Sequence, residues 1–132
     1  MRTRIIVGIS LLLSVLAVGT YTSRAGDGAG GRHWTIVNLT DPVLVKDQIV
    51  MGPVLIVHDD AKMGRGLPCT TFYRFDPATG PQEELVSFHC LRVQRAAVEQ
   101  TTFTLASTSG SCKRLTEYQI GGDAEAHGIP SK

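Results

Sequence analysis

The amino-acid sequence predicts an all-β domain, a small antiparallel β-sandwich or barrel of about seven short strands that follows a signal peptide. Two observations favour this class. Short runs of β-branched and aromatic residues alternate with turns rich in Gly, Pro and Asp, at spacings of about 8–12 residues. Outside the apolar N-terminal run, no segment shows the 3.6-residue period that is typical of an amphipathic helix.

Residues 1–25 have the pattern of a signal peptide. A basic start is followed by the apolar run 5–18, and Ser23 and Ala25 then supply the small residues of a signal-peptidase site. The run is shorter than the roughly 20 apolar residues of a membrane span. We therefore expect cleavage after Ala25, and the alternative is an uncleaved anchor that meets the membrane through residues 5–21.

Removal of this segment would leave one near-neutral domain in an oxidising compartment. The whole chain has 13 Lys and Arg against 12 Asp and Glu, and cleavage removes three arginines, so the net charge falls from +1 to −2. With no basic run, nucleic acid is not an expected partner. We expect a periplasmic or extracellular protein, with a flexible Gly-rich linker at 26–31 and a single β domain at 32–132.

Within the domain, each expected strand is a run of strand-forming residues that ends at a cluster of turn formers. The expected strands are residues 33–39, 43–45, 48–51, 54–58, two strands in the segment 69–91, 101–107 and 114–120. The segment 59–68 contains two glycines and a proline without periodicity, and we expect a loop there. Residues from 121 onward form an expected Gly-rich C-terminal tail.

A β-hairpin is predicted between Cys69 and Cys90, because residues 76–81 are dense in turn formers and have a strand-like run on either side. If the turn is symmetric, opposed residue numbers sum to roughly 159. The predicted pairs are then Phe75 with Glu84, Tyr73 with Val86, Thr71 with Phe88, and Cys69 with Cys90. This register collects one mostly apolar face, and a slip by one residue would scatter it.

Opposed residues of an antiparallel pair lie close enough for a disulfide, so this register predicts a Cys69–Cys90 bridge. Export of the domain makes such a bond chemically reasonable. The chain has three cysteines, and Cys112 is left over as a buried thiol, a free thiol or a contact to a partner.

Three histidines are candidates for a metal site. His58 precedes Asp59-Asp60 where a buried strand runs into a loop, His89 stands beside Cys90, and His127 lies in the tail. If these segments fold over one end of the sheet, the imidazoles could converge with Asp60 or Glu117 and bind zinc or copper. The alternative is that they are separate polar residues at strand ends, with no metal or other cofactor bound.

Catalytic motifs are not found. The chain has no Gly-x-Ser-x-Gly, no phosphate-binding Gly-rich loop, no Cys-x-x-Cys and no His-Glu-x-x-His, so we expect a binding or structural protein rather than an enzyme. His89 and Cys90 are neighbours on one strand and point to opposite faces, so this His is not expected to activate this Cys. A blue-copper site is not expected either, because neither Cys90 nor Cys112 is followed by closely spaced His and Met.

Four stretches, VMGPVLIVHDD, PCTTFYRFD, ELVSFHC and LTEYQIGGDAEAHG, resemble those of a family of small exported bacterial all-β proteins with no assigned activity. The resemblance spans about residues 35–130 and implies an exported all-β domain; it supplies no catalytic residues for particular positions. The sequence therefore predicts an envelope binding or structural module of unknown ligand and partner, stabilised by a Cys69–Cys90 disulfide. The alternative is a zinc or copper protein that uses His58, His89 and His127.

Overall fold

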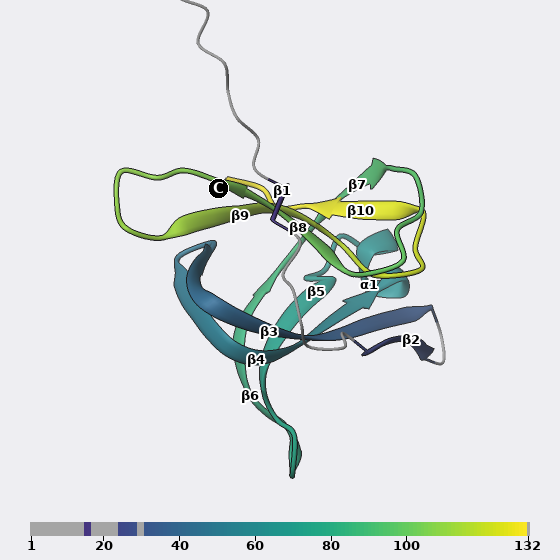
Figure 1. Ribbon diagram of the computed structural model, residues 1–132. Coiled ribbons are helices and arrows are strands. Elements are labelled where there is room, and N and C mark those ends of the chain that lie inside the picture. The colour runs from purple at the N-terminus through teal and green to yellow at the C-terminus, as the bar shows by residue number, and fades with distance from the viewer. Residues whose placement is uncertain (1–14, 17–23, 29–30, 132) are drawn as a thin grey trace, which may run out of the picture.

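The computed structural model describes residues 15–16, 24–28 and 31–131. Within these residues the chain is mostly β, with one short helix, which confirms the predicted all-β class (Figure 1). The elements are β1 (Val15–Leu16), β2 (Arg24–Gly28), β3 (Arg32–Val45), β4 (Gln48–Asp59), α1 (Asp60–Gly64), β5 (Thr70–Asp76), β6 (Gly80–Phe88), β7 (Leu91–Gln94), β8 (Thr102–Ala106), β9 (Lys113–Gln119) and β10 (Glu125–Gly128).

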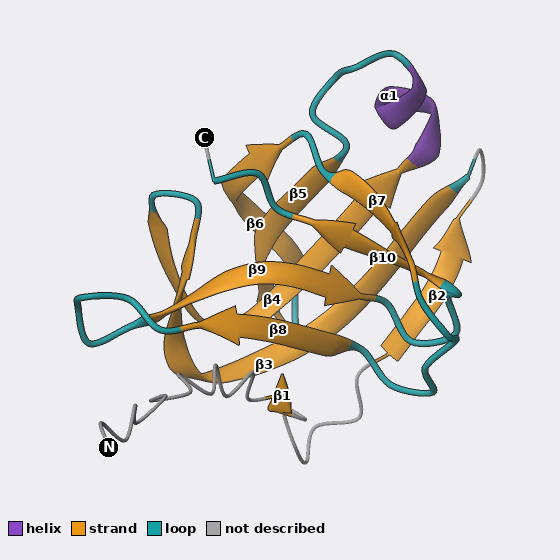
Figure 2. Cartoon of the chain, turned by 90° about the horizontal axis from the view of Figure 1, so that it is seen from above, coloured by secondary structure: helices purple, strands orange, loops and turns teal. Residues whose placement is uncertain are grey.

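The described strands join into one curled sheet, a half-barrel, with the order β1-β8-β9-β3-β4-β5-β6. β10 pairs with both β7 and β9, and β2 pairs with β3. The curl places β8, β9 and β10 over β3 and β4, with the core between them (Figures 1 and 2). The prediction of a purely antiparallel sheet is wrong at one point, because β3 and β9 pair in parallel at Val43–Lys113 and Leu44–Arg114.

β3 and β4 form one long hairpin where the sequence predicted four short strands. The expected turn at Lys46-Asp47 is present, and Lys46 adopts a φ of 59° there. The expected breaks near Pro42 and Gly52 are instead bends within continuous strands. A β-bulge separates Leu39 from Val43, and Gly52 has a φ of 83°, so both strands curve without ending.

The β5–β6 hairpin forms around the predicted turn, but its register differs from the prediction. Phe72 pairs with Val86 and Thr70 with Phe88, one residue away from the predicted register. Two irregularities, on either side of Tyr73, shift the pairing between the turn and the open end. Phe72 is consequently buried, whereas the symmetric turn had predicted Tyr73 and Phe75 on the apolar face.

Most of the predicted signal peptide lies outside the described residues. Of residues 1–25, the structure describes 15–16 and 24–25. Residues 15–16 form β1, which pairs with β8, and β2 spans Ala25 and part of the expected linker. In the expected tail, β10 is a strand that the sequence did not reveal. In the part of the chain that the structure describes, no helix has the length and apolar character to cross a bilayer.

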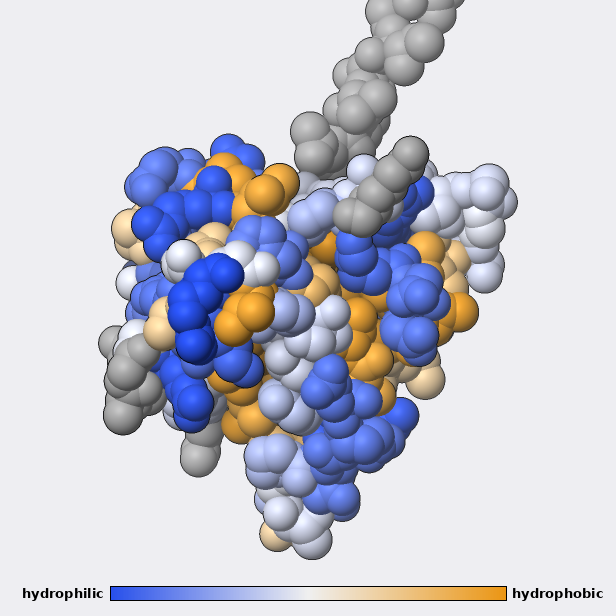
Figure 3. Space-filling view, turned by 180° about the vertical axis from the view of Figure 1, so that it is seen from behind, coloured by the Kyte–Doolittle hydropathy of each residue, from blue (hydrophilic) through white to orange (hydrophobic). Residues whose placement is uncertain are grey.

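The core is built mainly from the strands that face each other across the half-barrel. Its largest buried aromatic side chains are Phe72, Phe88, Phe103 and Tyr118, and Phe72 meets Tyr118 edge-on at a centroid distance of 6.2 Å. On the face seen in Figure 3, hydrophilic and apolar side chains are interspersed. Across the described residues, the large apolar side chains that remain exposed are Ile49, Met51, Leu67 and Leu91.

Candidate metal centre

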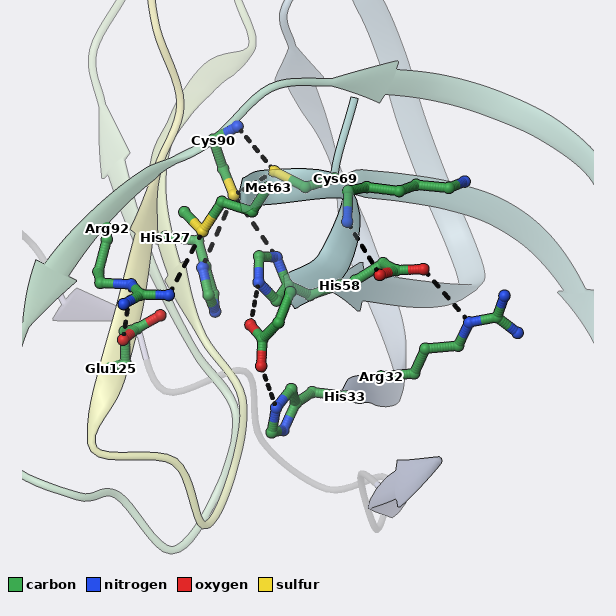
Figure 4. A network of polar contacts seen from close by, with 12 residues as sticks. Arg32, His33, His58, Met63, Cys69, Cys90, Arg92, Glu125 and His127 are labelled. Atoms are coloured by element: carbon green, nitrogen blue, oxygen red, sulfur yellow. Dashed lines mark hydrogen bonds and ion pairs between the residues drawn. The ribbon is translucent and has the colours of Figure 1, made fainter. Parts of the chain in front are cut away.

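One end of the half-barrel gathers two histidines and two cysteines from four segments. His58 is the penultimate residue of β4, and Cys69 directly precedes β5. Cys90 lies between β6 and β7, and His127 is on β10. The exposed fraction of each of these four residues is 2% or less. Buried side chains of this kind require partners, and they find them in one another (Figure 4).

The strand register explains why these segments meet. His58 pairs with Thr70, and Thr70 pairs with Phe88, so both cysteines come next to His58 at the open end of the hairpin. β10 then pairs with β7, with His127 opposite Arg92, two residues after Cys90. Distant parts of the sequence therefore meet only because of the sheet topology.

The sulfur of Cys90 is at the centre of the cluster. Its Sγ lies 3.5 Å from His58 Nδ1 and 3.7 Å from His127 Nδ1. The two imidazole rings stack on each other, with centroids 3.9 Å apart. Donor atoms of His58, Cys69 and Cys90 lie within 4.8 Å of one another, as do those of His58, Glu125 and His127. These two overlapping groups could each hold a metal ion.

Asp60 fixes the orientation of His58. Asp60 Oδ1 lies 2.9 Å from His58 Nε2, and Asp60 Oδ2 lies 3.2 Å from His33 Nε2. When His58 donates its Nε2–H to this carboxylate, its Nδ1 carries the lone pair and faces Cys90. A carboxylate behind an imidazole is the usual arrangement that orients a metal-binding histidine.

Burial keeps the imidazoles neutral. Burial, with the adjacent His58 acting in the same direction, lowers the pKa of His127 to about 3. The pKa of His58 is also lowered by burial, although the hydrogen bond with Asp60 acts in the opposite direction. Burial, followed by the contact with Cys69, raises the pKa of the Cys90 thiol to about 12. Without a cation, His58, His127 and Cys90 are therefore neutral.

The two cysteines are in contact without being bonded. Cys69 Sγ and Cys90 Sγ lie 2.8 Å apart, which is longer than the roughly 2.05 Å of a disulfide. The backbone N–H of Cys90 donates to Cys69 Sγ at 3.2 Å. Cys69 and Cys90 are not among the paired residues of β5 and β6, where Thr70 pairs with Phe88, but their sulfurs still meet at the mouth of the hairpin.

A polar pocket of about 410 Å³ lies beside the cluster and includes His127 in its wall. Arg92 and Glu125 form an ion pair there, with Nε and Oε2 3.0 Å apart. Arg92 Nη2 also donates to Met63 Sδ at 3.8 Å, and Met63 packs against the buried core (Figure 4). The carboxylates of Asp60, Asp123 and Glu125 outnumber the one arginine of the wall.

The predicted site residues divide into two groups. His58, Asp60 and His127 lie together, whereas His89 is exposed and its Nδ1 is 3.9 Å from Cys69 Sγ, on the other side of the cysteine pair. Glu117 pairs with Arg95 and does not take part. The sequence pattern indicated only a disulfide for Cys69 and Cys90, so their part as ligand candidates was missed. Their position beside His89 and at the end of a hairpin was the available signal.

Comparison of this chain with models of known protein families, with curated proteins and with solved structures finds no match.

Proposed function

We propose that this protein binds one soft or borderline d¹⁰ metal ion, Zn²⁺ or Cu⁺, at His58, Cys90 and His127. The observation that carries the proposal is the position of Cys90 Sγ, 3.5 Å and 3.7 Å from the two imidazole Nδ1 atoms. Ligand distances of about 2.0–2.1 Å to nitrogen and 2.3 Å to sulfur give an S···N edge of about 3.6 Å at a tetrahedral angle. The two measured separations bracket that edge.

Cys69 is the fourth ligand in this proposal. Two thiolates on one tetrahedral ion are about 3.8 Å apart, so a change in the Cys69 rotamer that moves its sulfur outward by about 1 Å would complete a Cys₂His₂ set. Such a set of two thiolates and two imidazoles suits Zn²⁺, and its sulfurs also suit Cu⁺. Hard ions such as Mg²⁺ and Ca²⁺ prefer oxygen ligands and are not expected.

The pocket supplies a route for the ion. Its wall carries more carboxylates than cationic groups, which favours the approach of a cation. Glu125 lies close enough to His58 and His127 to share an incoming ion with them before it reaches the sulfurs.

Titration of the reduced, untagged protein with Zn²⁺ and, anaerobically, with Cu⁺ tests the proposal. Isothermal titration and native mass spectrometry should find one ion per chain, and Co²⁺ used as a probe should give a thiolate-to-metal charge-transfer band. The relative affinities against competing chelators decide between the two ions.

Two cysteine variants provide the test and its control. Cys90→Ser should weaken the charge-transfer band, because only the Cys69 thiolate remains, and should weaken binding by at least about 100-fold, since it removes the thiolate that both imidazoles face. Cys112→Ser should leave binding unchanged. Failure of the wild-type protein to bind either ion, or equal binding by Cys90→Ser, would refute the proposed function.

The contact between the two sulfurs favours a second candidate, an envelope binding or structural module held by a Cys69–Cys90 disulfide. Closing this loop would stabilise the fold by about 3 kcal/mol in the chain-entropy model. Cys69→Ser should then lower the melting temperature under oxidising conditions, and an unchanged melting temperature would argue against the bridge.

Both candidates include export of the domain to the periplasm or beyond, for which the N-terminal pattern of residues 1–25 is the support. N-terminal sequencing of the protein recovered from cells should find residue 26 at the start of the chain, whereas recovery with residues 1–25 attached would favour the anchored form.

A further inference from the structure

The structure leads us to infer that Cys69 and Cys90 form a redox-active pair whose oxidation releases the bound ion. This inference depends on the proposed metal site, because it makes the same sulfur serve as ligand and as disulfide partner. Two forms follow: a reduced form that binds the ion, and an oxidised form with a Cys69–Cys90 bond that does not.

The distance between the sulfurs makes both forms accessible. At 2.8 Å, Sγ–Sγ lies between the roughly 2.05 Å of a disulfide and the roughly 3.8 Å of two thiolates on a tetrahedral ion. A small movement in either direction therefore reaches one of the two forms. Cysteine binds metals as the thiolate, and a disulfide sulfur has lost that charge.

Cys90 makes the two forms mutually exclusive. Its sulfur is the atom that faces both His58 Nδ1 and His127 Nδ1. When Cys90 bonds to Cys69, the two imidazoles lose their common thiolate, and the remaining nitrogen ligands are those of a much weaker site. Loss of Cys69 as well removes both sulfurs from the set.

The chemistry requires a two-electron oxidant, and a small-molecule disulfide is the class we propose. The Cys69 thiolate attacks one sulfur of the reagent, which forms a mixed disulfide and releases the first reagent thiol. The Cys90 thiolate then attacks Cys69 Sγ and releases the second. Two electrons pass from the protein to the reagent. The two reagent thiols take their protons from the protein thiols, or from water when the cysteines are bound to the ion as thiolates.

Cys69 is the sulfur placed to react first. The backbone N–H of Cys90 donates to its Sγ at 3.2 Å, which stabilises negative charge on that sulfur. Cys69 Sγ lies 3.9 Å from Nδ1 of the exposed His89, whereas Cys90 Sγ faces the two buried imidazoles. Cys90 is on the imidazole side and is the resolving cysteine.

The test uses a Cys112→Ser protein, in which only one pairing of cysteines is possible. The Zn²⁺-loaded protein is treated with oxidised glutathione, and released Zn²⁺ is followed with a chromophoric chelator while mass spectrometry follows the disulfide. We expect one ion to be released for each disulfide formed, with a mass lower by two hydrogen atoms. Reduction should restore binding.

A Cys69→Ser variant of the same protein distinguishes the proposed metal site from its control by oxidation. It keeps His58, Cys90 and His127, so it should bind Zn²⁺ more weakly yet keep its ion when oxidant is added. Retention of the ion after the bond has formed, or absence of a Cys69–Cys90 bond in the folded protein, would overturn the redox inference and leave the metal site intact. Absence of Zn²⁺ binding by the reduced protein would instead refute the proposed function, and the redox inference would fall with it.

Discussion

Replacement of Asp60 by alanine should weaken metal binding without unfolding the domain. The carboxylate of Asp60 holds His58 Nε2 at 2.9 Å and so turns the Nδ1 lone pair toward Cys90. Its removal lets the imidazole adopt the other tautomer, in which Nδ1 carries a proton and cannot bind an ion.

The expected loss of affinity is about tenfold, equivalent to about 1.4 kcal/mol. Carboxylates behind a metal-binding histidine typically contribute about 10–100-fold. The lower end applies here because the Asp60 side chain is 42% exposed, so water weakens its hydrogen bond and can partly replace it. Asp60→Asn should lose less than Asp60→Ala, because its amide oxygen still accepts from Nε2–H.

The assay is the dissociation constant for Zn²⁺ measured by competition with a chelator, alongside the melting temperature of the metal-free proteins. The short helix α1 should persist, because Asp59 and not Asp60 accepts the N–H groups of Ala61 and Lys62. Asp41→Ala, which removes an exposed carboxylate far along the sequence, is the matched control. If Asp60→Ala binds Zn²⁺ as tightly as the control, the carboxylate does not orient a ligand.

Three further predictions concern packing and thiol chemistry. Phe72→Ala should lower the free energy of unfolding by about 3–5 kcal/mol and Phe75→Ala by about 1 kcal/mol, since Phe72 is fully buried and Phe75 is half-buried; equal losses in denaturant titrations would contradict the observed register. Gly121→Ala should cost about 1–3 kcal/mol, because its Cβ would lie 2.8 Å from a backbone oxygen, and a neutral result would show that the backbone can shift. In the reduced, metal-free protein at pH 8, iodoacetamide should modify the half-buried Cys112 well before Cys90, whose pKa burial raises to about 12; similar rates by mass spectrometry would contradict this.

The sequence was informative wherever local chemistry decides the structure. The turn at residues 76–81 and the strand content of its flanks predicted the hairpin, and the hairpin brought Cys69 and Cys90 to the same mouth. The register inside the hairpin could not be obtained in this way. Two irregularities beside Tyr73 shift the pairing, and nothing in the composition of the strands marks their position.

The site depends on contacts that are distant in sequence. His127 reaches Cys90 because β10 pairs with β7, and both are short strands in segments whose composition suggested a connection and a tail. His89 is a different case, because alternation along the strand already places it opposite Cys90. Because neighbouring residues on a strand point to opposite faces, His89 could have been excluded from a site that contains Cys90, His58 and His127.

A purely structural explanation of the cluster has to satisfy every buried polar atom with hydrogen bonds. Cys90 has one thiol proton, and two imidazole Nδ1 atoms face its sulfur. When His58 donates its Nε2–H to Asp60, its Nδ1 carries a lone pair and needs the Cys90 thiol proton as its hydrogen-bond donor. His127 must then carry a proton on its own Nδ1 and donate it to the Cys90 sulfur. Sulfur is a weak hydrogen-bond donor to His58 and a weak acceptor from His127. One cation satisfies the thiolate and both lone pairs at once, and for that reason we favour a metal centre over a hydrogen-bonded core.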